Sequence, residues 1–494
     1  MINLIIVILA ISSLNPQPVF SQESSFPERK KLEGKEVGSY VMKPGTFQSY
    51  SADFGRILVP ENRNKKNSRI IHLIFIRICA LEDNSAEPVF LLNGGPGKSN
   101  IRGLLSPVFF THNDLVIVGY RGIDTSVRLE STKVSEAMTI ENPLSPLGMQ
   151  HISRIIKREF DRFKRNGVDI DGYTVLEVVD DIDLIRSALG YPKINLFSSS
   201  YGTILAYLYC QRYPEHANRN LMVGASNISR HLVRDPGVID KVFNAYGRLW
   251  ENDPQASERT PDIIKTIRKV LKTLPRYWNG IRIDADKIRI CTYWQLYETE
   301  TAAKIFDAFV AAENGDYSGL ALLSYSYDKE IPDWDLLCDY FSKAISCGLD
   351  TTRELAENMD PPESIIGSPS CKLILGSSSQ GAWPIKPIPL RYRTIDSCHV
   401  ETLIVMGNLD PSGPLDYVKE MMPYFKRGRL VVLSEMGHMD PANLQPKAFN
   451  HLGELFYSSG EVDTSKFVYN KMSFTPGETF QSLAKEVFKD KIKK

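Results

Sequence analysis

Short, uninterrupted apolar runs recur through the first 225 residues of the chain and return near residue 400. Each run has the length of a buried strand, and the clearest are 88–92, 114–119, 194–197 and 220–224. Apolar residues at helical spacing fill the stretch 174–189, just before the third of these runs. A helix that joins two such strands makes a parallel crossover, so the pattern predicts an α/β fold with a mostly parallel sheet flanked by helices.

The chain ahead of these strands predicts a hairpin. Two Ile-rich runs, Phe54–Pro60 and Arg69–Ile78, enclose the polar stretch 61–67, which is rich in Lys and Asn. We expect the two runs to pair as strands and the basic stretch to form a solvated surface turn.

The acids of the predicted helix 174–189 admit two interpretations. Asp180 and Asp181 are adjacent carboxylates, which would suit a metal-binding or acid/base pair. The apolar residues of the helix recur at the spacing of one inward face, which leaves the acids on the other side. We therefore expect Glu177, Asp180, Asp181 and Asp183 to lie on a solvated helix face.

The pattern changes between residues 226 and 395. This region has no long apolar strand and is dominated by aromatic-rich helical patterns. Strand character returns after it, and a terminal helix is expected over 476–494. We interpret the region as a mainly helical cap inserted into one sheet-bearing core. The predicted divisions are 22–225 for the first part of the core, 226–395 for the cap and 396–494 for the second part of the core, with cap helices at 241–250, 263–274, 293–312 and 334–346.

The first residues carry the pattern of a secretory signal. Ile2–Ile11 is almost entirely apolar and is followed by the polar stretch 12–22. The run is too short to span a bilayer, and Val19 and Ser21 suit a cleavage site. No Lys or Arg precedes the run, and a buried first strand is the alternative. We expect residues 1–21 to be a signal peptide, the protein to be exported (periplasmic or secreted), and no membrane-spanning segment to remain.

Composition narrows the range of partners. The chain has 59 basic and 59 acidic residues, a balance that argues against nucleic acid or an anionic membrane as the main partner. Its seven cysteines are dispersed without Cys-x-x-Cys or Cys/His spacing, so neither a metal site nor another cofactor is expected. The sequence leaves open the disulfides and the oligomeric state.

A strand-to-helix turn at 198–202 carries the strongest chemical signal. It follows the strand 194–197 and has the pattern Ser-x-Ser-x-Gly, centred on Ser200. A serine on so sharp a turn exposes its hydroxyl above the sheet edge, at a helix N-terminus. Ser198 stands where this motif usually has glycine, and Ser198 and Ser199 are expected to lie in the strand. Ser200 is therefore the candidate nucleophile, and a serine-rich loop of an ordinary α/β protein is the alternative.

The strand 88–92 leads directly into Asn93-Gly94-Gly95-Pro96-Gly97. Three glycines and a proline in five residues predict an irregular loop whose backbone approaches another group closely. The order of strand, Gly-rich loop, strand and nucleophile turn is that of an α/β-hydrolase sheet, in which the loop contributes to an oxyanion hole. The expected donors are the N–H groups of Tyr201 and of Gly94 or Gly95. A plain Gly-Pro turn is the alternative.

Asp410 and His438 complete a candidate triad. Each follows a predicted strand, and the carboxyl ends of parallel strands share one edge of a sheet. We expect Ser200, Asp410 and His438 to meet there. Histidine can accept the serine proton near neutral pH, while an acid fixes the imidazole tautomer. Asp416 is a rival acid, but it falls within a predicted helix over 415–422.

Several stretches resemble the proline iminopeptidase and tripeptidyl aminopeptidase family of α/β-hydrolases, which are serine peptidases. The loop 93–97 is similar to the His-Gly-Gly-Pro-Gly loop of the family, and the resemblance covers about 50–225 and 396–450. It implies an aminopeptidase whose cap supplies acids that bind the α-amine of the substrate. The other matching stretches are Val59–Arg63, Tyr120–Gly122, Val179–Asp181, Ser200–Thr203, Leu409–Pro411 and Gly437–His438.

Three departures from the family bear on specificity rather than on chemistry. Asn93 replaces the loop histidine, Ser198 replaces a glycine, and Gly119 replaces an aspartate. We predict an exported serine hydrolase that works through an acyl-enzyme, and we favour an aminopeptidase that releases N-terminal residues from short peptides. The alternatives are a carboxylester or lipid hydrolase, which Asn93 and the apolar cap favour, and a non-catalytic binding protein. The expected partner is a small peptide or acyl-ester substrate.

Overall fold

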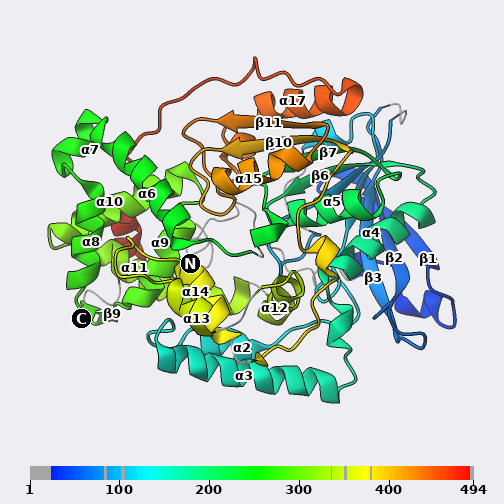
Figure 1. Ribbon diagram of the computed structural model, residues 1–494, viewed down its shortest axis with the longest axis horizontal. Coiled ribbons are helices and arrows are strands. Elements are labelled where there is room, and N and C mark those ends of the chain that lie inside the picture. The colour runs from blue at the N-terminus through cyan, green and yellow to red at the C-terminus, as the bar shows by residue number, and fades with distance from the viewer. Residues whose placement is uncertain are drawn as a thin grey trace.

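A nine-stranded sheet forms the centre of the protein, with strand order β1-β2-β3-β5-β4-β6-β7-β10-β11 (Figure 1). The computed structural model describes residues 24–82, 86–101, 106–230, 232–334, 336–349, 353–378 and 381–489. The expected signal peptide, residues 1–21, lies outside these ranges. The strands are β1 (Tyr40–Phe47), β2 (Tyr50–Pro60), β3 (Ile70–Ile78), β4 (Val89–Leu92), β5 (Leu115–Val118), β6 (Ile194–Ser199), β7 (Ala217–Val223), β10 (Glu401–Gly407) and β11 (Gly428–Leu433).

The predicted fold class is confirmed. Six neighbouring strands, in the order β5-β4-β6-β7-β10-β11, are parallel. The strands β1, β2 and β3 are joined to one another and to β5 by antiparallel pairing. The expected hairpin is the β2–β3 pair, and the apolar run 194–197 lies within β6. Because the parallel strands share a direction, the loops that follow β4, β6, β10 and β11 leave from one edge of the sheet.

Two apolar cores lie on the two faces of this sheet. Alternate side chains of a strand point to opposite faces, so Val89 and Phe90 belong to different cores. The helices α4 (Val175–Ala188) and α5 (Tyr201–Arg212) contribute to one core, and α17 (Pro446–Ser459) contributes to the other. Burial on both faces explains why these strands appear in the sequence as uninterrupted apolar runs.

Helices dominate the region between β7 and β10, which lies beside the sheet in Figure 1. A short antiparallel pair, β8 (Tyr277–Trp278) and β9 (Ile281–Arg282), is the other regular element among the described residues of this region. Two further helices, α2 (Thr132–Met138) and α3 (Pro146–Arg165), come from the segment after β5. The helices of the region are α6 (Pro236–Glu251), α7 (Pro254–Arg259), α8 (Ile263–Thr273), α9 (Ala285–Gln295), α10 (Thr299–Glu313), α11 (Ser318–Trp334), α12 (Leu337–Ser346), α13 (Arg353–Asn358) and α14 (Pro369–Ser377).

The helix expected over 293–312 is interrupted. Helix α9 ends at Gln295 and α10 begins at Thr299, so that residues 296–298 form a break. Glu298 has an extended backbone there, with φ of −123° and ψ of 141°. The break contains neither glycine nor proline, which is why the periodicity alone predicted one continuous helix.

The end of the chain crosses from the sheet to the inserted helices. After α17, an extended segment leads to α18 (Phe480–Val487), which packs against α11 and α10. Phe474 of this segment packs edge-on against Trp250, with ring centroids 5.1 Å apart. The last helix is shorter than the expected 476–494, and residues 490–494 lie outside the described ranges. Two short helices, α15 (Leu415–Met421) and α16 (Asp440–Asn443), follow β10 and β11 respectively.

Candidate active site

Ser200 occupies a strained turn between β6 and α5. Its φ of 52° and ψ of −125° lie in a region that costs a non-glycine residue about 1–3 kcal/mol and that is often found at functional sites. The turn is held because the Ser200 N–H donates to the Val223 carbonyl at 3.0 Å. Gly202 has no room for a side chain, since an added Cβ would lie 2.0 Å from the Leu92 oxygen. Ser198 is a poorer candidate for the nucleophile than Ser200, because it is fully buried and donates to the Leu221 carbonyl within the sheet.

Asp410 and His438 form a buried pair. The carboxylate of Asp410 lies 2.7 Å from His438 Nδ1, and both residues are at most 4% exposed. The other carboxylate oxygen accepts the N–H groups of Ser412 at 2.7 Å and Gly413 at 2.8 Å. With Asp410 as acceptor, we assign the proton of a neutral His438 to Nδ1, which leaves Nε2 as a proton acceptor. Asp416, the rival acid, is exposed and pairs with Lys241.

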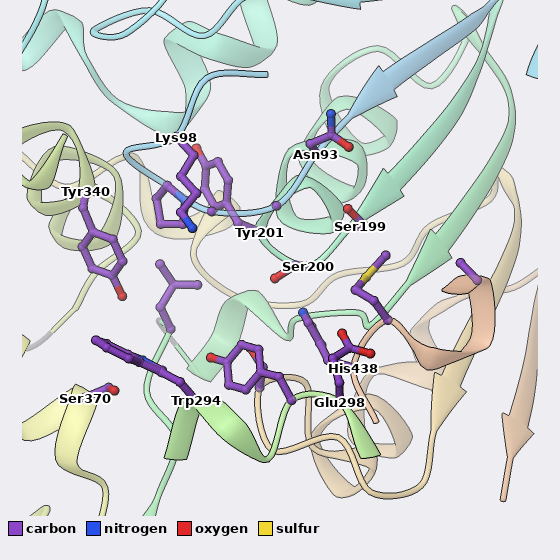
Figure 2. A pocket seen from close by; sticks show the side chains of 18 of the residues that line it. Asn93, Lys98, Ser199, Ser200, Tyr201, Trp294, Glu298, Tyr340, Ser370 and His438 are labelled. Carbon is purple, nitrogen blue, oxygen red and sulfur yellow. The ribbon is translucent and has the colours of Figure 1, made fainter. Parts of the chain in front are cut away.

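Ser200 and His438 line one cavity of about 640 Å³, and their side chains lie next to each other in Figure 2. His438 Nε2 is buried and has no hydrogen-bond partner among the described residues. Close packing at two glycines brings these segments together. A Cβ on Gly94 would lie 2.5 Å from the Cβ of Ser200, and one on Gly224 would lie 2.7 Å from the His438 ring.

The loop Asn93–Gly97 lies against Ser200, at the end of β4. Gly95 and Gly97 have φ of 81° and 85°, which only glycine adopts without strain. Within the described residues, the N–H groups of Gly94, Gly95 and Tyr201 donate to no protein acceptor. The predicted oxyanion donors are thus near the candidate nucleophile and available to a ligand.

The break between α9 and α10 places two residues beside His438 that the sequence did not reveal. The carbonyl of Tyr297 accepts the backbone N–H of His438 at 2.5 Å, and the two rings lie 5.3 Å apart. Glu298 lines the cavity next to His438 (Figure 2). Burial raises the pKa of Glu298 well above its usual value, and so do a hydrogen bond that protonated Glu298 donates to Asp440 and the negative charge of Asp440.

The cavity wall is mostly apolar. On the side of the core it includes Phe109 and Phe197, whose rings stack 4.2 Å apart. On the side of the inserted helices it includes Trp294, Tyr340 and Ser370. A cavity of this size and lining suits a small ligand with apolar groups.

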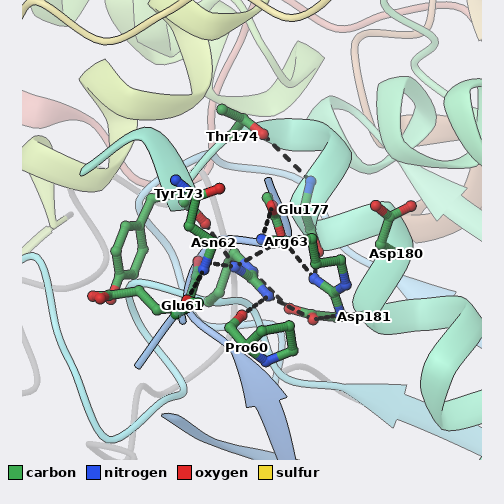
Figure 3. Close-up of polar contacts among 12 residues, drawn as sticks. Pro60, Glu61, Asn62, Arg63, Tyr173, Thr174, Glu177, Asp180 and Asp181 are labelled. Carbon is green, nitrogen blue, oxygen red and sulfur yellow. Dashed lines mark hydrogen bonds and ion pairs between the residues drawn. The ribbon is translucent and has the colours of Figure 1, made fainter. Parts of the chain in front are cut away.

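Glu177, Asp180 and Asp181 of α4 are buried and Asp183 is half-buried, so the expectation of a solvated helix face was wrong. Figure 3 shows the contacts of the buried acids. Arg121 donates from Nε and Nη2 to both oxygens of Asp181, at 2.7 Å each. Arg63 comes from the turn that was expected to be solvated, and it donates to Asp181 and Glu177 at 2.6 Å each. Asp180 pairs with Arg212 instead. Helical periodicity did not reveal this network because most partners lie 60 to 118 residues earlier in the chain.

The network acts as a structural anchor. Burial works to raise the pKa of Asp181, but the charges of Arg121 and Arg63 outweigh it and lower the pKa below its usual value. A carboxylate paired in this way fixes Arg121, and with it the loop after β5. Among the described residues, no group of three or more His, Cys, Asp or Glu is placed to hold a metal ion.

Two further findings concern the cysteines and the lengths of the helices. All seven cysteines are free thiols. A helix with the length and apolarity needed to cross a bilayer does not occur in the described part of the chain.

Residues 87–442 match the family described as alpha/beta hydrolase fold. The matched region is more than half of the chain and runs from the strand before the Gly-rich loop to just past His438. The chain therefore belongs to this family.

Curated relatives carry the names of serine peptidases. A tripeptidyl aminopeptidase of Streptomyces lividans is 27% identical over 216 residues, which cover 40% of this chain and 40% of the relative. Serine protease Hip1 of Mycobacterium tuberculosis is 28% identical over 187 residues, which cover 35% of each chain. The matches thus span two fifths or less of these relatives. These matches, although of modest identity, confirm the predicted resemblance to the proline iminopeptidase and tripeptidyl aminopeptidase family.

Solved structures similar to this chain include other alpha/beta hydrolases. An alpha/beta hydrolase from a deep-sea metagenome library is 12% identical with a TM-score of 0.38, over 86% of this chain and 100% of that one. A meta-cleavage product hydrolase from Pseudomonas fluorescens is 14% identical with a TM-score of 0.34, over 79% and 96%.

Proposed function

We propose that the protein is a serine hydrolase that works through an acyl-enzyme, with Ser200 as nucleophile, His438 as base and Asp410 as the acid that orients it. The observation that carries this proposal is the 2.7 Å contact between His438 Nδ1 and Asp410. It leaves the unpaired Nε2 as the acceptor, on a residue that shares a cavity with Ser200.

The reaction follows from these roles. Ser200 Oγ bonds to the substrate carbonyl carbon while His438 Nε2 takes the hydroxyl proton. The N–H groups of Tyr201 and of Gly94 or Gly95 donate to the oxyanion that forms. The bond to the leaving amine or alcohol then breaks, and His438 returns the proton to it. Water attacks the acyl-enzyme in the same manner and releases the acid.

Within this chemistry we propose an aminopeptidase that acts on short peptides. The names of the relatives support it, and so does Glu298, the one acidic side chain among the described residues that line the cavity. A substrate ammonium group beside Glu298 would favour the charged carboxylate, which burial and the neighbouring Asp440 disfavour. The acid that binds the α-amine would then come from the break between α9 and α10.

Labelling with a fluorophosphonate probe tests the nucleophile. We expect the purified protein to be labelled, Ser200→Ala to remain unlabelled, and Ser199→Ala to be labelled like the parent. Ser199 is a fair control because it also borders the cavity but belongs to β6. Equal labelling of Ser200→Ala would contradict the proposal. Robust turnover that His438→Ala abolishes would exclude the binding-protein alternative.

A substrate panel tests the specificity. We expect aminoacyl naphthylamides to be cleaved, and Glu298→Gln to raise KM for them at least tenfold, since an ammonium would lose its charged partner. An ester or lipid hydrolase is the second candidate, favoured by the apolar wall at Phe109 and Phe197. Turnover of short acyl nitrophenyl esters without cleavage of any free-amine substrate would establish that candidate instead.

Export is part of the proposal and rests on the apolar run Ile2–Ile11 and the polar stretch after it. We expect the full chain to leave the cytoplasm and a form lacking residues 2–21 to stay. Retention of the full chain, with its N-terminus intact, would contradict this.

A further inference from the structure

We propose that Arg234 and Ser370 form a subsite for a carboxylate group of the substrate, on the wall of the cavity that the inserted helices contribute. This inference rests on the proposed function and deepens it, because it names a chemical class that the substrate must carry.

Arg234 is a cation without an anionic partner. Its guanidinium donates to the Ser412 carbonyl at 2.8 Å, the Ser412 hydroxyl at 3.2 Å and the Leu232 carbonyl at 2.7 Å. All three acceptors are neutral, and no described carboxylate forms an ion pair with Arg234. These bonds use three of its five N–H groups and fix its orientation. A guanidinium held in this way on an apolar wall is poised to pair with an anion.

Ser370 supplies the second, independent observation. Its hydroxyl is buried, borders the same cavity and has no hydrogen-bond partner among the described residues. A buried hydroxyl without a partner is costly unless a ligand completes it. Ser370 is also close to Arg234 along the backbone, because the backbone N–H of Arg234 contacts the sulfur of the next residue, Cys371, at 3.4 Å.

The surroundings favour an anion further. Ser370 lies in the first turn of α14, whose positive end adds to the field of the guanidinium. In the view of Figure 2, Ser370 lies across the cavity from Ser200 and His438. One ligand can therefore contact Ser370 at one end and the two candidate catalytic residues at the other.

A carboxylate fits this set best. Its two oxygens match the planar guanidinium, and one of them can also accept the Ser370 hydroxyl. Glu298 is the one acid among the described residues of the lining, and Lys98 and Arg234 are its two cations, so the cavity offers partners for both an ammonium and a carboxylate. A short peptide carries both groups. The carboxylate is either its free C-terminus or an acidic side chain.

Matched substrate pairs test the proposal. We would measure kcat/KM for tripeptides with a free or an amidated C-terminus, and for tripeptides with Glu or Gln at each position. In at least one of these pairs the parent protein should prefer the acid about 10- to 100-fold, through KM, as for a hydrogen-bonded charge. Arg234→Met should reduce that ratio to about one, Arg234→Lys should retain part of it, and Ser370→Ala should reduce it several-fold.

Arg230→Met is the matched control. Arg230 lies four residues earlier, is partly exposed and is already paired with Glu420, so its loss should leave the ratio unchanged. Calorimetric titration of Ser200→Ala protein with the acid and amide peptides provides a readout that does not depend on turnover. The acid should bind more tightly in this protein, and Arg234→Met should remove the difference.

Two results would overturn the subsite. One is equal binding and turnover of acids and their neutral partners by the parent protein. The other is a fall in fluorophosphonate labelling of Arg234→Lys as large as its fall in peptide turnover, which would mean that Arg234 acts only as a brace for Ser412 and Asp410. Failure of the proposed function is distinguishable, because then the parent protein itself would not be labelled.

Discussion

At the scale of single residues, the candidate site depends on polar atoms with a fixed partner on one side and none on the other. His438 is held at Nδ1 and free at Nε2, and Arg234 is held by neutral acceptors and lacks an anion. Such residues are oriented by the protein and completed by a ligand. This arrangement yields two predictions about individual acids.

The first concerns the orientation of His438. Asp410→Asn should lower kcat by about 10⁴-fold, because the amide can donate to Nδ1 and so stabilise the wrong imidazole tautomer. Steady-state kinetics on the best substrate of the panel would measure this. Asp416→Asn is the control, and it should leave kcat unchanged since Asp416 is exposed and already pairs with Lys241. Comparable losses in both variants would refute the assignment of the acid.

The second concerns Glu330, a half-buried acid outside the site. Burial raises the pKa of Glu330 in α11 to about 8, and its Oε1 has no described partner. The folded state therefore holds a proton that the unfolded state releases near pH 4.3, so this acid costs stability increasingly as pH rises from about 4 to 8.

Glu330→Gln should remove that cost. We expect the variant to gain stability relative to the parent as pH increases from 5 to 8, as measured by urea unfolding at each pH. Glu251→Gln, a change at an exposed acid of α6, should leave the pH dependence as it is. If the difference in unfolding free energy between Glu330→Gln and the parent protein were the same at pH 5 and pH 8, the prediction would be refuted.

At the scale of elements, helix α12 holds the Gly-rich loop in place. Asp339 accepts the N–H of Gly97 at 3.3 Å, while the carbonyl of Gly97 accepts the N–H of Leu336 at 2.9 Å. Lys343 pairs with Asp339 at 3.0 Å and donates to the carbonyl of Tyr173 at 2.8 Å. Both charged side chains are about 1% exposed. The inserted region thus contributes to the position of the candidate oxyanion loop.

Breaking this pair should be costly. Asp339→Asn should lower the free energy of unfolding by about 3–5 kcal/mol, because it leaves the charge of Lys343 buried without a partner. The double change Asp339→Asn with Lys343→Met should recover most of that loss. Urea unfolding of the two single variants and the double variant measures the coupling. Additive losses would show that the pair is not an energetic unit.

Elements of the core were largely predictable, and those of the inserted region less so. The strands β4 to β7 are mostly buried on both faces, so their apolar runs stand out in the local sequence. Ser200, Asp410 and His438 each follow such a run, and this position singled them out as candidates. The break at Glu298 was hidden because helix-forming residues fill it. Its conformation coincides with contacts to residues about 140 positions later, such as the bonds from Thr299 to Asp440 at 2.8 and 3.0 Å. The burial of Asp181 escaped prediction for the same reason.

At the scale of the whole molecule, the chain visits the inserted region twice. It enters after β7, returns to complete the sheet, and then crosses again so that α18 packs against α11 and α10. Met472, on the crossing segment, donates from its N–H to Glu435 of the core at 2.7 Å. The final helix therefore links the two parts of the protein.

Removing the packing of α18 should destabilise the whole protein. Leu483 is 2% exposed, and Leu483→Ala should cost about 2–5 kcal/mol of unfolding free energy. Lys485→Ala, at an exposed position of the same helix, should cost little. Thermal unfolding followed by two probes would report this, and a loss below that of Lys485→Ala would contradict the assigned packing.

The late position of α18 also has a consequence for biosynthesis. A ribosome makes the nucleophile turn long before it makes His438, and it makes α18, which covers α11, later still. A growing chain that has not reached His438 would therefore lack the proposed general base, and one that has not reached α18 would expose the apolar surface of α11. The proposed hydrolytic activity would begin only after both segments have been synthesised.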